Sequence, residues 1–186
     1  MEIDEINEDI LNDINKNIQN DSSNIKSLKG FEIICESMVY KILDIFGKNS
    51  LLSMLYQTGS GPGEVIAKRI KEKYNKEEFG IFEALEILMT ELKDFYSIQI
   101  REVQLNSDQT RVVIENFCFL REASKRREKL QPGKAFCRVN KGYFETAFRK
   151  LLGNKVKKIE INFLQDAPEK NVCVEELIFY HNTDKV

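Results

Sequence analysis

The sequence predicts an α+β domain in which an antiparallel sheet of about four strands packs on a layer of helices. Apolar residues recur at helical spacing through most of residues 1–95, and the period becomes strand-like after Tyr96. Two pairs of strand-like segments follow, with an amphipathic helix between them. Helices and hairpins in this order are typical of the α+β class. The 186 residues, 42% of them hydrophobic, suffice for one domain with a substantial core.

Residues 1–25 are expected to form an N-terminal amphipathic helix with a linker, and residues 26–186 the main domain. The linker is the polar stretch QNDSSN. An isolated amphipathic helix must pack either on its own domain or on a second subunit. Its apolar stripe consists of Ile3, Ile6, Ile10, Ile14 and Ile18.

Three more helical segments are expected before the sheet. The first runs from Phe31 to Tyr56 with a break at residues 47–50, the second starts near Pro62 and ends at Tyr74, and the third begins near residue 81. The core-facing residues of the first segment are Ile34, Met38, Ile42 and Ile45, continued after the break by Leu51, Met54 and Leu55. Those of the third are Ile81, Leu85, Leu88, Leu92 and Phe95.

The first hairpin consists of strands Ser97–Leu105 and Arg111–Phe117, joined by a turn at residues 106–109. A basic run between residues 121 and 129 follows it. Because this run contains no interleaved aromatic residues and includes two glutamates, a solvated helix or loop explains it better than a nucleic-acid site.

The second hairpin follows an amphipathic helix, Gly142–Leu152, for which Gly153 provides a left-handed cap. Strands Lys155–Phe163 and Val172–Tyr180 flank a turn at residues 166–169. The residues on one face of the first of these strands are Ile159, Ile161 and Phe163.

Charge and composition exclude several classes of protein. A net charge of −2 gives no field that would hold nucleic acid. No apolar run approaches the roughly 20 residues that cross a bilayer, and the acidic N-terminus does not resemble a signal peptide, so a cytoplasmic protein is expected. Four scattered cysteines argue against a disulfide framework. With one histidine, His181, and no nucleotide motif, neither haem nor a nucleotide cofactor is expected.

Glycines cluster at residues 59–63, in the order Gly-Ser-Gly-Pro-Gly. A phosphate-binding loop would need a preceding strand and a Lys-Ser/Thr pair, and both are missing from the sequence. Close helix packing or a helix break explains the cluster better.

Aromatic residues gather between Phe117 and Phe148, where the sheet and helices should meet. Most such clusters are core, and these residues by themselves favour core over a pocket. Helices over a curved sheet can nonetheless enclose an apolar cavity that binds hydrocarbons or aromatics. No catalytic constellation is evident in the sequence, so nothing here requires an enzyme.

The chain resembles the vinyl-4-reductase domain family over roughly Phe31 to Phe179. The resemblance rests on a cysteine followed by a Gly-Tyr pair that opens a helix, a Gly-Asn-Lys before a strand, and a cysteine-bearing hairpin. In this sequence the matching residues are Cys137, Gly142, Tyr143, Gly153, Lys155 and Cys173, with Phe117-Cys118-Phe119 and Leu55–Gly59 upstream.

The resemblance implies the α+β fold of TRAPP-complex subunits, a homodimer and an internal hydrophobic pocket. The family includes sensor domains of aromatic-responsive activators and predicted archaeal hydrocarbon-binding proteins, which this chain resembles most. Binding or sensing of a small hydrophobic molecule is therefore expected. The alternatives are a scaffold subunit without a soluble ligand and, with least support, a reductase. The expected lining residues are Tyr56, Phe82, Phe117, Phe136, Tyr143, Phe144 and Phe148.

The resemblance also implies a zinc site, because the sensor branch of the family holds zinc with cysteines and a glutamate. Cys137, Glu160 and Cys173 match these ligands position by position. Phe163 stands where the remaining cysteine is expected, and Cys118 is a possible replacement. Three thiolates and a carboxylate would satisfy tetrahedral zinc. The alternative is that these cysteines are buried, inert thiols.

Overall fold

A computed structural model of the chain describes residues 16, 27–118, 121, 135, 137–167 and 170–182. The chain divides into two compact units, Met1–Met38 and Val39–Val186. The predicted N-terminal helix, Lys16 apart, and the predicted boundary after residue 25 lie outside the described residues. No helix in the described ranges is long and apolar enough to cross a membrane.

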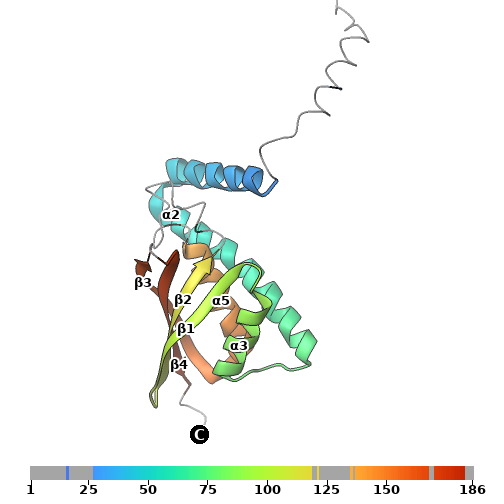
Figure 1. Ribbon diagram of the computed structural model, residues 1–186, viewed down its shortest axis with the longest axis vertical. Helices are drawn as coiled ribbons and strands as arrows, with labels where there is room; N and C mark the ends of the chain where they lie inside the picture. Colours follow the sequence, from blue (N-terminus) through green and yellow to red (C-terminus); the bar gives the residue numbers. More distant parts are fainter. Residues whose placement is uncertain are drawn as a thin grey trace, which may run out of the picture. The chain divides into compact units, whose positions relative to one another are not determined.

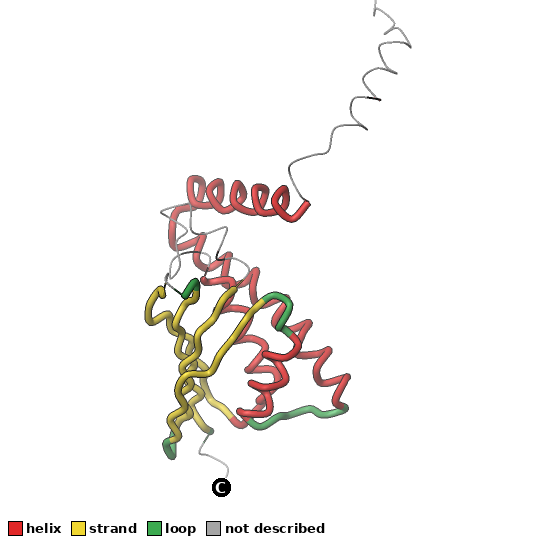
Figure 2. Tube along the Cα trace, viewed as in Figure 1, coloured by secondary structure: helices red, strands yellow, loops and turns green. Residues whose placement is uncertain are grey.

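The predicted α+β fold is confirmed. Four strands form one antiparallel sheet in the order β1-β2-β4-β3. Figure 2 shows the strands of this sheet side by side in yellow. From Val39 onward, α2 lies with α3 and α5 on one side of this sheet, and α5 packs directly on β3 (Figure 1). The elements are α2 (Ser27–Tyr74), α3 (Ile81–Glu91), β1 (Tyr96–Leu105), β2 (Gln109–Cys118), α5 (Cys137–Leu152), β3 (Val156–Ala167) and β4 (Val172–His181).

Helix α2 confirms one of its predicted breaks and contradicts the other. Gly47 has φ 76° and ψ 175°, a conformation that glycine adopts readily and other residues do not. The helix then continues through Pro62 to Tyr74, so the predicted new start near Pro62 is wrong. A proline inside a helix costs about 3 kcal/mol. On either side of Pro62, Gly59 and Gly63 lie directly against the backbone of α5.

The prediction that the stripe of α2 faces a core is also wrong for most of its members. Ile34, Met38 and Ile45 are exposed, and Ile42 is the member that packs on a buried cluster. The predicted continuation of the stripe after the break is confirmed for Leu51 and Leu55, which are buried in this cluster, whereas Met54 is exposed. The buried members of the cluster are Val39, Leu51, Leu55 and Ala135.

Helices α2 and α5 approach each other at their glycines. A Cβ at Gly59 would lie 2.0 Å from the carbonyl oxygen of Val139, and a Cβ at Gly142 would lie 2.1 Å from that of Tyr56. These distances leave no room for a side chain on either helix. Of the two explanations for the glycine cluster, close helix packing is therefore correct.

Both hairpins agree with the prediction, with small differences at their ends. The first turn occupies the predicted position, and a bulge places Arg101 as an extra residue in β1. Helix α5 begins at Cys137, five residues before its predicted start, and Gly153 has the expected positive φ of 56°. Strand β3 continues to Ala167, so residues 166 and 167 of the predicted second turn belong to the strand, and Lys170 and Asn171 lie in the turn before β4.

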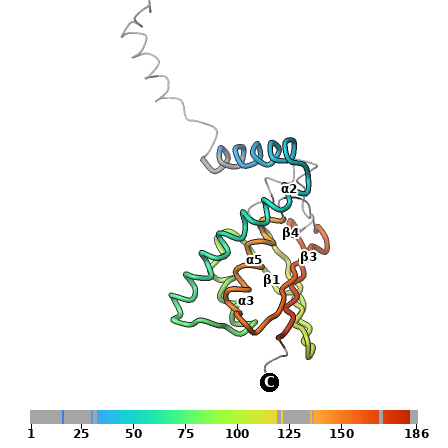
Figure 3. The backbone as a smooth tube through the Cα atoms, turned by 180° about the vertical axis from the view of Figure 1, so that it is seen from behind, coloured from blue at the N-terminus to red at the C-terminus, as the bar shows by residue number. Residues whose placement is uncertain are grey.

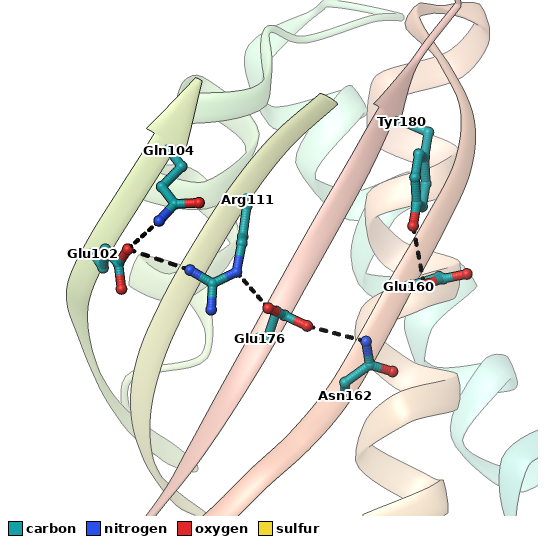
Figure 4. Close-up of polar contacts among 7 residues, drawn as sticks. All are labelled: Glu102, Gln104, Arg111, Glu160, Asn162, Glu176 and Tyr180. Atoms are coloured by element: carbon teal, nitrogen blue, oxygen red, sulfur yellow. Dashed lines mark hydrogen bonds and ion pairs between the residues drawn. The ribbon is translucent and has the colours of Figure 1, made fainter. Parts of the chain in front are cut away.

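The two faces of the sheet differ in polarity. The inner face meets α3 and α5, which lie along the same side of the sheet when it is seen from behind (Figure 3), and its Leu177 and Phe179 are fully buried. The outer face carries a polar network across the strands (Figure 4). There Arg111 binds Glu176 and Glu102, and the Asn162 amide donates to the second oxygen of Glu176 at 3.2 Å.

Candidate ligand-binding site

A pocket of about 240 Å³ lies between the beginning of α5 and strands β3 and β4. It is entirely within the second unit. Its apolar side chains come from β3 and its charged side chains from α5 and β4. The lining residues are Cys137, Arg138, Asn140, Lys141, Ile161, Asn162, Phe163 and Glu175.

Glu175 is the most unusual residue of this pocket. It lies on the inner face of β4 between Cys173 and Leu177, and it is only 5% exposed. Burial raises the pKa of Glu175 to about 7, and a hydrogen bond from Asn116 opposes this rise. The Asn116 Nδ2 donates to Glu175 Oε2 at 3.2 Å, which is the only hydrogen bond of this carboxyl group within the described part of the chain.

Asn116 adds an unsatisfied acceptor behind Glu175. Its side-chain carbonyl oxygen is buried and has no hydrogen-bond partner among the described residues. Buried polar atoms of proteins nearly always have a partner, and leaving one unpaired costs about 1–3 kcal/mol. The Asn116 oxygen and the Glu175 carboxyl group can therefore each accept a further hydrogen bond.

Asn140 is the second buried amide of the site. The Tyr96 hydroxyl group donates to Asn140 Oδ1 at 3.0 Å, and burial raises the pKa of Tyr96. This bond links the beginning of the sheet to the first turn of α5. It holds the Asn140 side chain in a fixed orientation beside the pocket.

The chemistry of the pocket follows from this arrangement. Glu175 accepts hydrogen bonds when it is ionised and can donate one when it is protonated, and both forms are populated near pH 7. Arg138 and Lys141 also line the pocket and disfavour a cation inside it. A neutral ligand with a hydrogen-bond donor suits these surroundings best.

Three of the predicted lining residues lie together, but as core. Phe144 and Phe148 are fully buried, and their ring centroids are 6.5 Å apart. Tyr143 packs on the same cluster, 5.8 Å from the Phe144 ring, and burial raises the pKa of Tyr143 to about 12. Phe144 and Phe148 are therefore core residues, and Tyr143 is a partly buried neighbour of this core.

The other predicted lining residues lie apart from one another. Phe82 is 48% exposed, and Phe117 lies half-buried on the outer face of β2. Tyr56 is half-buried on α2 and hydrogen-bonded to Glu145. Phe136 lies outside the described residues. None of the six described residues of the predicted set lines the 240 Å³ pocket.

Glu160 points away from the predicted zinc position. It lies on the outer face of β3, where the Tyr180 hydroxyl group donates to it at 3.2 Å and Lys158 pairs with it (Figure 4). The ion pair with Lys158 lowers the pKa of Glu160. Its strand neighbours Ile159 and Ile161 face the core, so the alternation of the strand sends the glutamate to the opposite side.

The cysteines do not form a metal site with it. Cys118 and Cys173 are buried on the inner face, and Cys137 begins α5 beside the pocket. Within the described ranges no three His, Cys, Asp or Glu residues are placed to hold a metal ion. Burial raises the pKa of Cys173 to about 11, although Arg121 beside it opposes this rise. With Glu160 on the opposite face of the sheet, the assigned residues lack their carboxylate ligand and do not fit zinc as they stand.

Four residues of this region were not predicted from the sequence: Glu175, Asn116, Asn140 and Arg121. The burial of Glu175 could have been predicted, because Glu175 and the buried Leu177 are two residues apart on β4 and therefore lie on the same face of the sheet. Arg121 belongs to the basic run that was expected to be solvated. That expectation is wrong for Arg121, which is buried, and the other basic residues of the run lie outside the described residues.

The sequence matches no protein-family model and no curated protein. The structure is similar to the crystal structure of the phenol-responsive sensory domain of the transcription activator PoxR with phenol. The TM-score is 0.54 at 15% sequence identity, and the alignment covers 80% of this chain and 74% of the sensory domain. At this identity the likeness shows a shared fold. Membership of the vinyl-4-reductase family stays a prediction.

Proposed function

We propose that this chain binds a small, mainly apolar molecule with one hydrogen-bond donor, and that it acts as a sensor domain. The observation that carries this proposal is the buried carboxyl group of Glu175 in a pocket of about 240 Å³. The shared fold with a domain described as phenol-responsive supports it. A hydroxylated one-ring aromatic is the simplest molecule of this class.

The pocket has the size and chemistry for such a ligand. The volume of about 240 Å³ exceeds that of the enclosed apolar cavity of about 150 Å³ that binds benzene, which supports a one-ring ligand with part of its surface in solvent, because this pocket is open on one side. Ile161 and Phe163 supply apolar contact area, and Glu175 supplies the acceptor. Since two cationic side chains share the lining, a neutral hydroxyl group is favoured over an ammonium group.

Thermal-shift and calorimetric titrations with phenol and toluene test the proposal. Phenol should raise the Tm of the full chain, and toluene, which lacks a donor, should bind more weakly. Glu175→Gln should weaken phenol binding by about tenfold, the usual value of one hydrogen bond to a charged group. Glu176→Gln, a change on the opposite face of the same strand, is the matched control and should bind phenol normally. Equal binding of both compounds to all three proteins would contradict the role of Glu175.

A sensor must also convert binding into a change that another molecule detects. A ligand can do this only if it binds one conformation or assembly state better than another. We propose a homodimer as the assembly that responds. Light scattering with and without phenol tests this, and a monomer under both conditions would remove the dimer from the proposal.

A scaffold role is the second candidate, and one observation favours it. The centre of the space between the sheet and α5 is filled by aromatic rings, with the Phe148 and Phe179 centroids 5.2 Å apart. A subunit that serves only assembly would need no larger cavity. If no apolar compound shifts the Tm and Glu175→Gln alters nothing except stability, the scaffold role replaces the sensor role.

A further inference from the structure

Arg121 is one of the largest fully buried side chains in the described part of the chain, at 2% exposure. A buried guanidinium group is costly unless its N–H groups are paired. Here Nε donates to Asn171 Oδ1 at 3.1 Å, Nη1 to Cys173 Sγ at 2.9 Å, and Nη2 to Asp166 Oδ1 at 2.5 Å. One planar group thus reaches three partners in three directions.

The three partners belong to a single corner of the fold. Asp166 and Cys173 face each other across the β3–β4 register, and Asn171, with φ 58°, forms part of the turn between these strands. Arg121 comes from the connection between β2 and α5. Its side chain therefore cross-links this connection to both strands and to the turn of the last hairpin.

We propose that Arg121 takes the place of a metal ion as the cross-link of this corner. It is a cation in contact with Cys173, one of the residues that the family resemblance assigns to zinc, and it would repel a second cation at the same sulfur atom. Another assigned ligand, Glu160, is engaged on the opposite face of the sheet.

The replacement has a chemical consequence. A guanidinium group stays charged at all pH values at which proteins are folded, and it needs no supply of metal. A zinc cross-link, in contrast, requires thiolates and is lost to chelators and to acid. This corner should therefore be insensitive to metal and dependent on Arg121. The inference is independent of whether the chain binds phenol.

Metal analysis and thermal unfolding of the untagged full chain test the inference. The purified protein should contain far less than one zinc per chain, and its Tm should not change after dialysis against EDTA. Arg121→Met should lower the Tm by about 8–15 °C, because it leaves the Asp166 carboxylate and its neighbours without the cation. Arg149→Met removes an exposed arginine that pairs with Glu145, and should change the Tm by less than about 2 °C.

Two outcomes would overturn the inference. In the first, the purified protein contains about one zinc per chain, EDTA removes this zinc and lowers the Tm, and the Cys173→Ser variant binds no zinc. The other is an Arg121→Met variant as stable as Arg149→Met. If Arg121→Met does not fold, Arg121→Lys keeps the charge without the planar fork and should fold with a lowered Tm. If neither variant folds, the zinc content of the unaltered protein tests the inference.

Discussion

Gly59 of α2 lies directly against the backbone of α5, since a Cβ at this position would be 2.0 Å from the carbonyl oxygen of Val139. No side-chain movement can relieve a clash between a methyl group and a backbone carbonyl. The two helices therefore depend on this glycine for their separation. α5 carries four of the residues that line the pocket, so the same contact also sets the position of the pocket.

Gly59→Ala should lower the free energy of unfolding by about 2–3 kcal/mol, because α5 must move away. Gly61→Ala is the matched control two residues further along the helix, where an added methyl group would meet nothing within 4 Å. It should instead be neutral or stabilise by up to about 1 kcal/mol, since alanine favours a helix. Urea unfolding of both variants checks this, and equal effects would contradict the close approach.

Glu175 should make stability fall as the pH rises. Its pKa is about 7 in the folded protein and 4.5 ordinarily, so the folded state holds the proton more tightly than the unfolded chain does. Proton binding by Glu175 therefore stabilises the folded protein fully below pH 4.5, and this stabilisation is lost as the pH rises through 7. The difference corresponds to at most about 3 kcal/mol. Urea unfolding between pH 4.5 and 8 should show this loss in the unaltered protein and not in Glu175→Gln.

Tyr96→Phe should lower the free energy of unfolding by about 1–3 kcal/mol. The variant removes a buried donor and leaves the Asn140 oxygen without its 3.0 Å hydrogen bond. Tyr74→Phe is the control, because Tyr74 is 46% exposed and the variant keeps the ring over which the Lys73 ammonium group lies. Chemical denaturation distinguishes the two, and a Tyr96→Phe variant with unchanged stability would mean that the bond contributes nothing.

Phe148→Ala should cost about 3–5 kcal/mol, the usual value for a buried phenylalanine. Phe82→Ala should cost less than about 1 kcal/mol because Phe82 is half exposed. If Phe148 instead lined a ligand cavity, truncation would cost little and would enlarge the set of compounds that bind. Denaturation, followed by a thermal-shift panel of larger aromatics on the Phe148→Ala protein, separates these outcomes.

The parts of the fold that depend on local chemistry were predictable from the sequence. The first hairpin turn, the break at Gly47 and the cap at Gly153 all lie where their residue types place them. The helix through Pro62 was not predictable, because the contact of Gly59 with α5 outweighs the local preference of a proline. That contact joins residues about 80 positions apart, and no local pattern contains it.

The candidate site was less predictable than the fold. Parity along β4 indicates that Glu175 faces inward, but its pairing with Asn116 follows from the strand order, which places β2 beside β4. Parity along β3 was sufficient to show that Glu160, between two inward isoleucines, faces away from Cys173. The alternation of β3 therefore separates Glu160 from Cys173, although both match ligand positions in the family resemblance.

The bulge at Arg101 protects an exposed edge of the protein. β1 is an edge strand, and its Ile100, Val103 and Leu105 side chains are exposed. Such a strand invites pairing with another chain and can seed aggregation. An incoming strand would meet a shifted register at the bulge, together with the charges of Arg101 and Glu102, after a few hydrogen bonds. This interruption should keep the protein dispersed at concentrations at which an uninterrupted apolar edge would form fibrils.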